Sequence, residues 1–469
     1  MPRIAIAGPS HIVTDAAASV GVEGGSVVDV AIVAALTAMC TEPGVCGPGG
    51  GGFMTIDIPG QSAVVVDGYM AYPGRGFAGR PLVRKVTMPY GGGVTTLVDA
   101  GSIAVPGVFA ALEASWGIGG RLPWRVLMDA VATAVEEGFP LSAPCHHYLS
   151  DGAAPIFQTD PVARDSLLDD DVSKPIGATV LFPGLAETLR HIGDEGARSF
   201  YEGDVAEIIA SDLEARGGML TRQDMETYEA VVREPMRVVL GEWRIGLNPA
   251  PAVGGTTVAR VLEFLSGTGL EDDVVMAKAL VDAFTTRNRE TLRSPSTISI
   301  AAVDEDGGAV AGSFSAGYGS GVIPAGTGML MNNALGELEL IDGDGEPGER
   351  MISNMAPSVA RRGADAVAVG SPGAERITTA VATTLTRLAA GADLRTAIDH
   401  PRTHPEFGEF GVRLAAEPGL ELGGAGLPLR WYERRHMFFG GVNGAGFVDG
   451  RLVAHADSRR TGSVAFTTH

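Results

Sequence analysis

Residues 294–315 read SPSTISIAAVDEDGGAVAGSFS, and this stretch predicts a β-hairpin. Residue character alternates along Thr297 to Val303 and again along Ala309 to Ser315, as expected for two paired strands. Asp304 to Gly308 lies between them and carries the acidic and glycine residues typical of a tight turn.

Thr297 stands at the beginning of this hairpin, directly after the polar, proline-bearing segment Ser294 to Ser296. A threonine released as a new N-terminus would carry a nucleophilic hydroxyl beside an α-amine. That amine has a pKa of about 7.7–8, so it can act as a general base at neutral pH. Threonine is also common in strands because β-branched residues fit a pleated sheet. The local sequence by itself favours this ordinary explanation.

Helical and extended patterns alternate outward from the hairpin without a clear linker. Upstream, Val27 to Met39 is apolar nearly all round and predicts a buried helix, which the strand Phe53 to Ile58 follows. Downstream, Ala366 to Val369 predicts a strand and Ile377 to Ala389 a helix. The C-terminal part, including Trp431 to Phe439, is predicted to be mostly β. These patterns favour one compact α/β body.

The composition excludes several classes of protein. The chain has 469 residues, of which 45% are hydrophobic and 19% are charged, so it can bury a large core. Its formal net charge of −21 would repel nucleic acid or an anionic membrane surface, and we expect neither as a partner. Cys40 and Cys46 are expected to be buried thiols, with a bridge between them as the alternative; Cys145 is the third cysteine. The N-terminus lacks a secretory pattern, so we expect a cytoplasmic protein.

Other kinds of site find little support. The run Gly47 to Gly52 lacks the Lys-Ser/Thr ending of a phosphate loop and leads into a strand, so it is interpreted as a close-packed glycine turn. His400 and His404 have helical spacing, but Pro401 and Pro405 break such a helix, and a structural turn is favoured over a zinc site. The sequence therefore predicts no metal and no cofactor.

Several separated segments resemble blocks of the γ-glutamyltranspeptidase family of N-terminal-nucleophile hydrolases. They follow the family's order and cover nearly the whole chain: Gly24–Asp29, Glu42–Pro43, Gly49–Met54, Val105–Gly107, Gly120–Trp124, Leu220–Tyr228, Arg233–Pro235, Gly319–Asn333, Ser353–Pro357, Gly370–Gly373 and Pro401–His404. On this resemblance the chain is identified as a divergent member of the family.

The resemblance implies an α/β fold of the αββα four-layer sandwich type and autocatalytic cleavage between Ser296 and Thr297. The large-subunit region would be residues 1–296 and the small-subunit region residues 297–469, and the two fragments would remain together as a heterodimer in one compact body. Thr297 takes the place of the family's nucleophile. Ser315 falls near a second family threonine that hydrogen-bonds the nucleophile.

The resemblance also assigns binding residues. Gly373 and Ala374 fall where the family has the two glycines of its oxyanion hole, and backbone N–H groups serve there, so a methyl group is compatible with the role. At the donor-binding positions, Glu337 keeps a carboxylate and Ser353 a hydroxyl, whereas Asn354 replaces a second serine.

The main departures concern the donor pocket. The family's arginine that clamps the donor α-carboxylate is missing, since Asp67-Gly68-Tyr69-Met70 stands in place of the DxRE motif. Arg75 or Arg80 would have to replace it, although a bidentate clamp cannot move without reshaping the pocket. Ala334 and Gly317 also replace polar residues. These changes argue against ordinary glutathione turnover.

A further departure concerns processing. Only 13 positions separate Phe284 from Thr297, where family members place a longer stretch. Ile298 and Ser299 replace the second threonine and the histidine of the family's nucleophile motif.

Three hypotheses follow. The favoured one is an autoprocessed N-terminal-threonine acyl hydrolase or transferase that acts on a small molecule other than a plain γ-glutamyl peptide. It fits a tailoring step in bacterial specialised metabolism, because similar family members in pathways to the alkylproline units of antibiotics are thought to cleave a C–C bond; amide cleavage and activated C–C cleavage both stay open. The alternatives are a true γ-glutamyl hydrolase or transpeptidase acting on glutathione-like substrates, and an unprocessed, non-catalytic binding protein.

Overall fold

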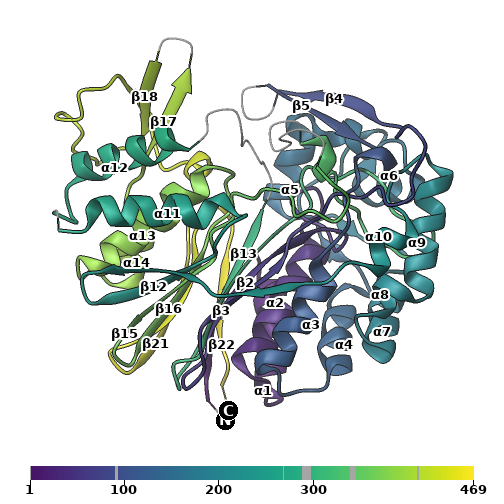
Figure 1. Cartoon of the computed structure of the whole chain (residues 1–469), viewed down its shortest axis with the longest axis horizontal. Helices are drawn as coiled ribbons and strands as arrows, with labels where there is room; N and C mark the ends of the chain where they lie inside the picture. The colour runs from purple at the N-terminus through teal and green to yellow at the C-terminus, as the bar shows by residue number, and fades with distance from the viewer. Residues whose placement is uncertain are drawn as a thin grey trace.

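The protein consists of two large β-sheets that lie face to face, with helices covering the outer face of each (Figure 1). The computed structural model describes residues 2–89, 93–267, 269–287, 297–337, 345–408 and 411–468. The layer order helix, sheet, sheet, helix confirms the predicted αββα sandwich.

The first sheet has seven antiparallel strands. Their order across the sheet is β10 (Val231–Arg233), β3 (Val64–Gly68), β2 (Gly51–Asp57), β14 (Ala309–Ser315), β13 (Ile298–Asp304), β1 (Ile4–Gly8) and β22 (Ser463–Phe466). The predicted hairpin is therefore confirmed as β13 and β14, and it occupies the middle of the sheet.

The second sheet has six antiparallel strands. Their order is β11 (Met236–Leu240), β12 (Trp243–Leu247), β15 (Ser358–Arg362), β16 (Asp365–Gly370), β20 (Asn443–Val448) and β21 (Arg451–Ala456). Small side chains fill the space between the two sheets, among them Ala301 of β13, Ala368 of β16 and Ala445 of β20. Such short side chains let the sheets approach closely, which holds β13 rigidly from one face.

The helices fall into two groups. Those on the side of the first sheet are α1 (His11–Val22), α2 (Val27–Thr41), α3 (Val108–Gly119), α4 (Trp124–Val135), α5 (Ala143–Tyr148), α6 (Pro161–Leu167), α7 (Leu185–Glu195), α8 (Ser199–Glu202), α9 (Asp204–Ala215) and α10 (Arg222–Glu226). Those on the side of the second sheet are α11 (Val253–Leu265), α12 (Asp273–Thr286), α13 (Arg376–Ala389) and α14 (Leu394–Asp399).

Shorter strands complete the structure. They are β4 (Arg84–Met88) with β5 (Val94–Val98), β6 (Phe139–Pro140) with β9 (Thr179–Val180), β7 (Leu168–Asp169) with β8 (Val172–Ser173), and the three-stranded group β17 (Thr403–Gly408), β18 (Gly411–Ala416) and β19 (Leu429–Trp431).

Helix α2 supports the other face of the central hairpin. Its N-terminus carries a capping box in which Ser26 Oγ accepts from the Asp29 N–H and the Asp29 carboxylate accepts from the Ser26 N–H. Every residue of α2 is buried, and the helix packs against β13 and β14. The predicted buried helix is confirmed.

The glycine run before β2 is a site of close backbone contact, as predicted. A Cβ atom on Gly50 would lie 2.2 Å from the backbone oxygen of Ser315, and one on Gly52 would lie 2.2 Å from that of Ser313. Glycine is required at these positions because any side chain would push β2 away from β14.

The predicted β structure from Trp431 to Phe439 is wrong. Strand β19 ends at Trp431, and Met437–Phe439 forms a 3₁₀ turn that the His436 side chain caps. The aromatic residues favoured a strand, but they instead pack on one another in a folded loop: the rings of Tyr432 and Phe438 stack with centroids 5.5 Å apart.

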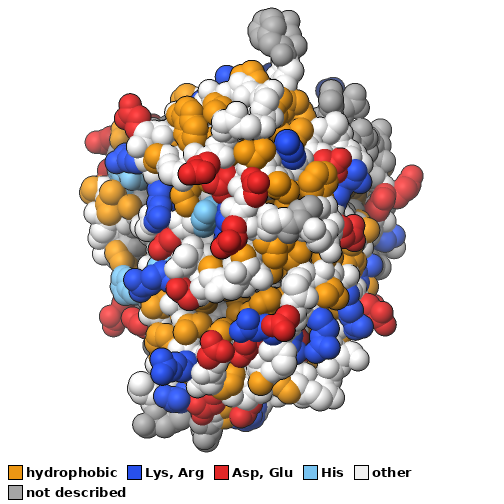
Figure 2. Space-filling view, turned by 90° about the vertical axis from the view of Figure 1, so that its left-hand side faces the viewer, with side chains coloured by type: hydrophobic (Ala, Val, Ile, Leu, Met, Phe, Trp, Pro, Cys, Tyr) orange, Lys and Arg blue, Asp and Glu red, His pale blue; other side chains and the backbone are white. Residues whose placement is uncertain are grey.

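Acidic and basic side chains are mixed with apolar ones on the face shown in Figure 2. Among the helices of the described ranges, none is both long and apolar enough to cross a membrane.

Candidate active site

Thr297 lies directly before β13, in the middle of the first sheet, and only 2% of it is exposed. It lines a cavity of about 30 Å³ together with Pro372 and Arg460. Glu42 and Asp457 line the same cavity. The predicted nucleophile therefore borders an internal space at the end of a rigid strand.

Ser315 is placed opposite Thr297 by the register of the hairpin. Ile298 pairs with Phe314, so Thr297 and Ser315 occupy the next position of the antiparallel ladder. The Ser315 hydroxyl accepts a hydrogen bond of 3.0 Å from the N–H of Gly317. The fold thus brings the two hydroxyl-bearing residues named from the sequence to neighbouring strand ends.

Gly373 and Ala374 form the loop between β16 and α13, and both have positive φ values, 131° and 58°. The left-handed conformation is uncommon for alanine and is maintained only where the surroundings impose it. Within the described ranges, the N–H groups of Gly373 and Ala374 donate no hydrogen bond. Pro372, the preceding residue, borders the Thr297 cavity. The loop therefore presents two unused backbone donors close to that cavity.

The residues predicted to bind the donor form a second buried group. Tyr69, which stands where the family has its arginine, is fully buried, and so are Glu337 and Ser353. Burial raises the pKa of Tyr69; the charge of Glu337 raises it further, and a hydrogen bond with Ser353 opposes the rise. A Cβ on Gly317 would lie 3.2 Å from the Glu337 carboxyl carbon. The structure thus brings two positions at which the sequence departs from the family, Tyr69 and Gly317, next to the retained Glu337.

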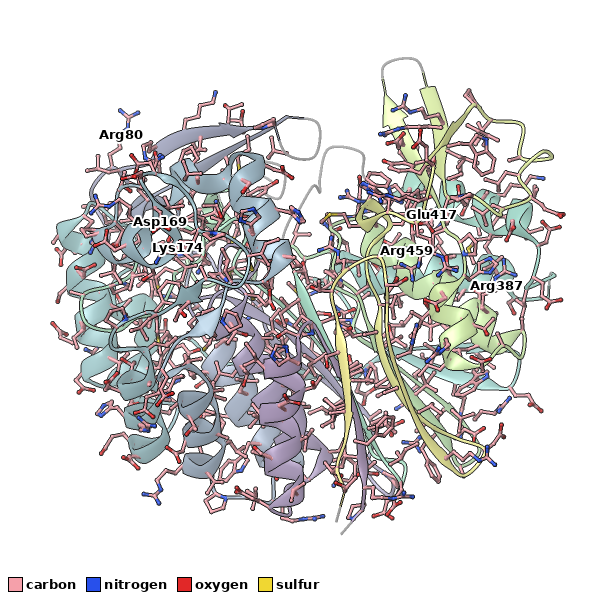
Figure 3. The ribbon with its side chains drawn as sticks, turned by 180° about the vertical axis from the view of Figure 1, so that it is seen from behind. Arg80, Asp169, Lys174, Arg387, Glu417 and Arg459 are labelled. Atoms are coloured by element: carbon pink, nitrogen blue, oxygen red, sulfur yellow. The ribbon has the colours of Figure 1, made fainter. Side chains whose placement is uncertain are left out.

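The two candidate replacement arginines have different surroundings. The Arg75 N–H donates to Asp224 at 2.9 Å, and its guanidinium Nε lies 4.0 Å from the same carboxylate. Arg80 is exposed and projects from the edge of the molecule (Figure 3).

A group of charged residues that was not predicted from the sequence lies beside the Gly373–Ala374 loop. Arg287 donates a hydrogen bond to Oδ1 of Asn354. Glu375, the residue after Ala374, lies 3.8 Å from Nε2 of His404, whose Nδ1 is 2.8 Å from the Thr379 hydroxyl. His404 belongs to β17, so the predicted turn at this residue is wrong. The adjacency of Glu375 to the predicted oxyanion residues was the available signal, whereas nothing in the sequence marks Arg287.

Burial and charge set the protonation of this group. Burial lowers the pKa of His404, and Glu375 opposes that shift. Burial alone would raise the pKa of Glu375, but His404, Arg376 and Arg287 more than compensate, and the pKa lies below its usual value. Glu375 is therefore ionised at neutral pH.

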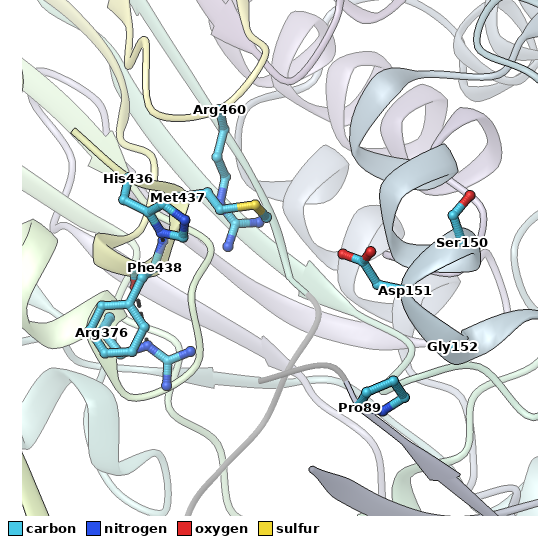
Figure 4. A pocket seen from close by; sticks show the side chains of 9 residues that line it. All are labelled: Pro89, Ser150, Asp151, Gly152, Arg376, His436, Met437, Phe438 and Arg460. Atoms are coloured by element: carbon cyan, nitrogen blue, oxygen red, sulfur yellow. Dashed lines mark hydrogen bonds between the residues drawn. The ribbon is translucent and has the colours of Figure 1, made fainter. Parts of the chain in front are cut away.

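A larger cleft of about 610 Å³ adjoins the same region (Figure 4). Arg376, Phe438 and Arg460 line one wall, and Asp151 lies on the opposite wall. Arg460 also borders the Thr297 cavity, so this side chain is common to both spaces. The cleft has the size of a small-molecule binding site.

The described ranges contain no group of three or more His, Cys, Asp or Glu side chains that could hold a metal ion. The chemistry available near Thr297 is that of hydroxyl groups, backbone donors and charged side chains.

Comparison with known proteins places this geometry in a family. Residues 14–285 and 275–467 match the gamma-glutamyltranspeptidase family model. The chain is 27% identical to the glutathione hydrolase proenzyme of Pseudomonas aeruginosa, over 80% of this chain and 78% of that protein. It is 23% identical to the glutathione hydrolase proenzyme of Escherichia coli, over 82% and 78%.

Solved structures share the fold over almost the full length. Cephalosporin acylase from Bacillus halodurans matches with a TM-score of 0.82 at 20% identity, covering 99% of this chain and 96% of that one. The structure of LmbA2991HD matches with a TM-score of 0.77 at 17% identity, covering 99% and 98%. The family match spans most of the sequence and the four-layer fold agrees with it, so the chain belongs to the γ-glutamyltranspeptidase family of N-terminal-nucleophile hydrolases, which are enzymes.

Proposed function

We propose that this enzyme is an autoprocessed N-terminal-threonine acyl hydrolase or transferase with an altered donor pocket. The observation that carries the proposal is the position of Thr297. It lies directly before β13 of the central hairpin and shares a cavity with Pro372, whose loop carries two N–H groups that have no acceptor among the described residues. Cleavage before Thr297 would give fragments 1–296 and 297–469, which stay together as a heterodimer.

The reaction begins when the Thr297 hydroxyl attacks a substrate carbonyl and the free α-amine of the same residue takes the hydroxyl proton. The N–H groups of Gly373 and Ala374 stabilise the oxyanion of the tetrahedral intermediate. Collapse of the intermediate breaks the bond to the leaving group, which receives the proton from the ammonium. Water or an amine then attacks the resulting ester, with the α-amine again as base. Ser315 positions the Thr297 hydroxyl.

The donor pocket is proposed to exclude plain γ-glutamyl peptides. Tyr69 replaces the arginine expected there, and its hydroxyl is already engaged by Ser353 beside Glu337. A phenol cannot supply the paired charged donors of a guanidinium. Glu337, Ser353 and Asn354 are the proposed donor-binding residues.

Such a pocket fits a cytoplasmic tailoring enzyme of bacterial specialised metabolism that cleaves an amide or an activated C–C bond. C–C cleavage needs no different nucleophile, because attack on an activated ketone gives the same acyl-threonine and releases a stabilised carbanion that takes the proton.

Intact mass spectrometry tests the cleavage. We expect the wild type to give two fragments that meet at Ser296 and Thr297, and Thr297→Ala to stay uncut. Thr297→Ser keeps a hydroxyl and is the matched control, for which slow cleavage is expected. An uncut wild-type chain would support the non-catalytic binding protein instead.

Turnover of γ-glutamyl-p-nitroanilide tests the donor. We expect the cut enzyme to hydrolyse it poorly. Robust hydrolysis that Thr297→Ala abolishes would instead support a true γ-glutamyl hydrolase or transpeptidase, the activity for which the relatives in Pseudomonas aeruginosa and Escherichia coli are named.

A further inference from the structure

Glu42, the C-cap residue of α2, borders the proposed nucleophile but has no part in the acyl-transfer steps proposed above. It is only 3% exposed, and it lines the Thr297 cavity. It also lines a second cleft of about 370 Å³, together with Ser10, His11 and Ser142. Glu42 therefore lies between Thr297 and a space that is large enough to contain water.

The uncut chain lacks the base that the mature enzyme would use. Before cleavage, the nitrogen of Thr297 belongs to the peptide bond with Ser296, and its lone pair is delocalised into the carbonyl group. An amide nitrogen of this kind cannot take the proton of the Thr297 hydroxyl. Autocatalytic cleavage therefore needs a proton acceptor from another residue.

Two of the described residues that line the Thr297 cavity carry a carboxylate, Glu42 and Asp457. Burial alone would raise the pKa of Asp457, but Arg402 and Arg459 more than compensate, and the pKa lies below its usual value. A carboxylate held ionised in this way is a weak base. Asp457 is therefore the poorer proton acceptor of the two.

Glu42 has neutral hydrogen-bond donors instead. Its Oε2 accepts from the Ser142 hydroxyl at 2.7 Å and from the Cys145 thiol at 3.2 Å. Burial raises the pKa of Glu42, and these hydrogen bonds oppose the rise without cancelling it. The carboxylate is therefore more basic than one in water.

The shared cavity provides a path for the proton. Its volume of about 30 Å³ has room for one or two water molecules. Pro9, Val45 and Pro144 supply apolar parts of its lining. Water confined there can pass a proton from the Thr297 hydroxyl to the Glu42 carboxylate.

We propose that Glu42 is the proton acceptor for the cleavage before Thr297 and acts through water in the shared cavity. The assignment rests on the proposed function, because it presupposes that this bond is cut. As Thr297 Oγ bonds to the carbonyl carbon of Ser296, the hydroxyl proton passes to Glu42. When the C–N bond breaks, Glu42 returns the proton to the Thr297 nitrogen, which leaves an ester and a free amine.

Hydrolysis of that ester completes the cleavage. The oxygen of a water molecule bonds to the ester carbon, and Thr297 Oγ leaves with one proton of that water. The second proton goes to the new α-amine, so Ser296 ends as a carboxylate and Thr297 as an ammonium. Glu42 is unchanged at the end, and the amine is then available as the base for turnover.

Other titratable groups face Glu42 from several elements. Cys145 of α5 and Cys46, in the segment between α2 and β2, are buried thiols with raised pKa values, so both stay neutral at pH 7. Asp457 and Arg460 line the Thr297 cavity, and His11 of α1 lines the outer cleft. His11 therefore needs its own control in any measurement of pH dependence.

The rate of cleavage tests the assignment. The chain is made by cell-free translation, and the fraction that stays at 469 residues is followed by intact mass spectrometry. We expect Glu42→Gln, which keeps the shape of the side chain, to be cut at least about 100-fold more slowly than the wild type. The control is Glu113→Gln on α3, a partly buried glutamate whose pKa burial also raises, and it should be cut at the wild-type rate.

An uncut wild-type chain would refute the proposed function. A wild type that is cut, with Glu42→Gln cut equally fast, would overturn only the role of Glu42.

The pH dependence of the rate separates a proton acceptor from a merely structural residue. A carboxylate must be ionised to accept a proton, so the wild-type rate should rise with pH and level off between about pH 5 and 9. Glu42→Asp should be slower but keep this profile, and Glu42→Gln should lose it. His11→Gln should keep the wild-type profile. A wild-type rate that does not change with pH, or the same profile in Glu42→Gln, would contradict the proposal.

Chemical rescue provides a third readout. Formate can enter the space left in Glu42→Ala through the outer cleft that Glu42 lines. We expect formate to accelerate cleavage of this variant at least 10-fold more than formamide, which has the same shape but no charge. Equal effects of the two additives would overturn the proposal. If Glu42→Ala and Glu42→Gln fail to fold, the pH profile of Glu42→Asp decides, and a rate that falls as pH rises contradicts the role of Glu42.

Discussion

Arg402 and Asp457 form an ion pair of 2.7 Å in which neither side chain is exposed to solvent by more than 1%. Arg459 extends the pair, contacting Asp457 at 3.1 Å and Glu417 at 2.5 Å. Since Asp457 also lines the Thr297 cavity, this buried network fixes one wall of the candidate site. Arg459 and Glu417 are marked in Figure 3.

Removing one partner should be strongly destabilising. We expect Arg402→Leu to lower the free energy of unfolding by about 3–5 kcal/mol, because Asp457 loses part of its compensation inside the protein. Urea unfolding in the uncut Thr297→Ala background measures this. The control is Arg435→Leu, whose side chain is 44% exposed and lies 3.7 Å from Asp399; a loss of similar size there would contradict the argument.

The left-handed backbone of Ala374 gives a second prediction. Ala374→Gly should raise stability by about 1 kcal/mol, because glycine adopts this conformation without a Cβ clash, and it should keep turnover because the N–H remains. Ala374→Val should lower both stability and turnover. Ala390, which has a φ of −76°, provides the control: Ala390→Gly should not raise the stability. Thermal unfolding and initial rates report these outcomes.

Close contact at the glycine run gives a third prediction. The new Cβ of Gly50→Ala would lie 2.2 Å from the Ser315 oxygen, so we expect β2 to be displaced and stability to fall by about 3 kcal/mol or more. Gly117 has open space around it in α3, and Gly117→Ala should be stabilising by about 0.5–1 kcal/mol. We expect urea unfolding to show a lower free energy of unfolding for Gly50→Ala and a higher one for Gly117→Ala, each relative to the wild type.

The turn of the central hairpin gives a prediction about pH. Burial raises the pKa of Asp304 to about 6 from 3.8, although the Gly308 N–H donates to its carboxylate at 2.7 Å. The folded state therefore binds a proton more tightly than the unfolded state between about pH 4 and 6, and stability falls as pH rises through that window. Asp304→Asn keeps the acceptor and removes the ionisation.

Relative to Asp304→Asn, we expect the wild type to lose about 1–3 kcal/mol of unfolding free energy between pH 4 and pH 7. Both proteins are measured by urea unfolding across this range in the Thr297→Ala background. The control is Asp15→Asn, at an exposed position of α1. Its curve of unfolding free energy against pH should be parallel to that of the wild type. Parallel curves for Asp304→Asn and the wild type would contradict the assignment.

Local patterns were enough to predict the central hairpin, α2 and α13. In each, the signal lies within the element: alternation around an Asp-Gly turn, or an apolar run of helical length. The strand predicted up to Phe439 is wrong for the opposite reason. Its aromatic rings pack on one another within one folded loop and not on a neighbouring strand.

The site was predictable only in part. Thr297 and Ser315 share one hairpin, so their proximity follows from its register. Contacts between Tyr69 and Ser353, or between Arg287 and Asn354, join segments far apart in the sequence, and no local pattern indicates them. The positive φ of Ala374 is likewise imposed by tertiary structure, since alanine does not favour it.

The order of strands in the two sheets has a consequence for maturation. Strands β1 and β2 come before Thr297 and flank β13 and β14, which come after it, and β12 pairs with β15 across the same divide. A cut at Thr297 would leave two polypeptides interleaved through both sheets. Reassembly after denaturation would then be a bimolecular reaction that depends on concentration, whereas the uncut precursor folds as a single molecule. Such a cleavage would therefore have to follow folding. The cut protein would then stay folded because it unfolds slowly, not because the folded and unfolded states are in reversible equilibrium.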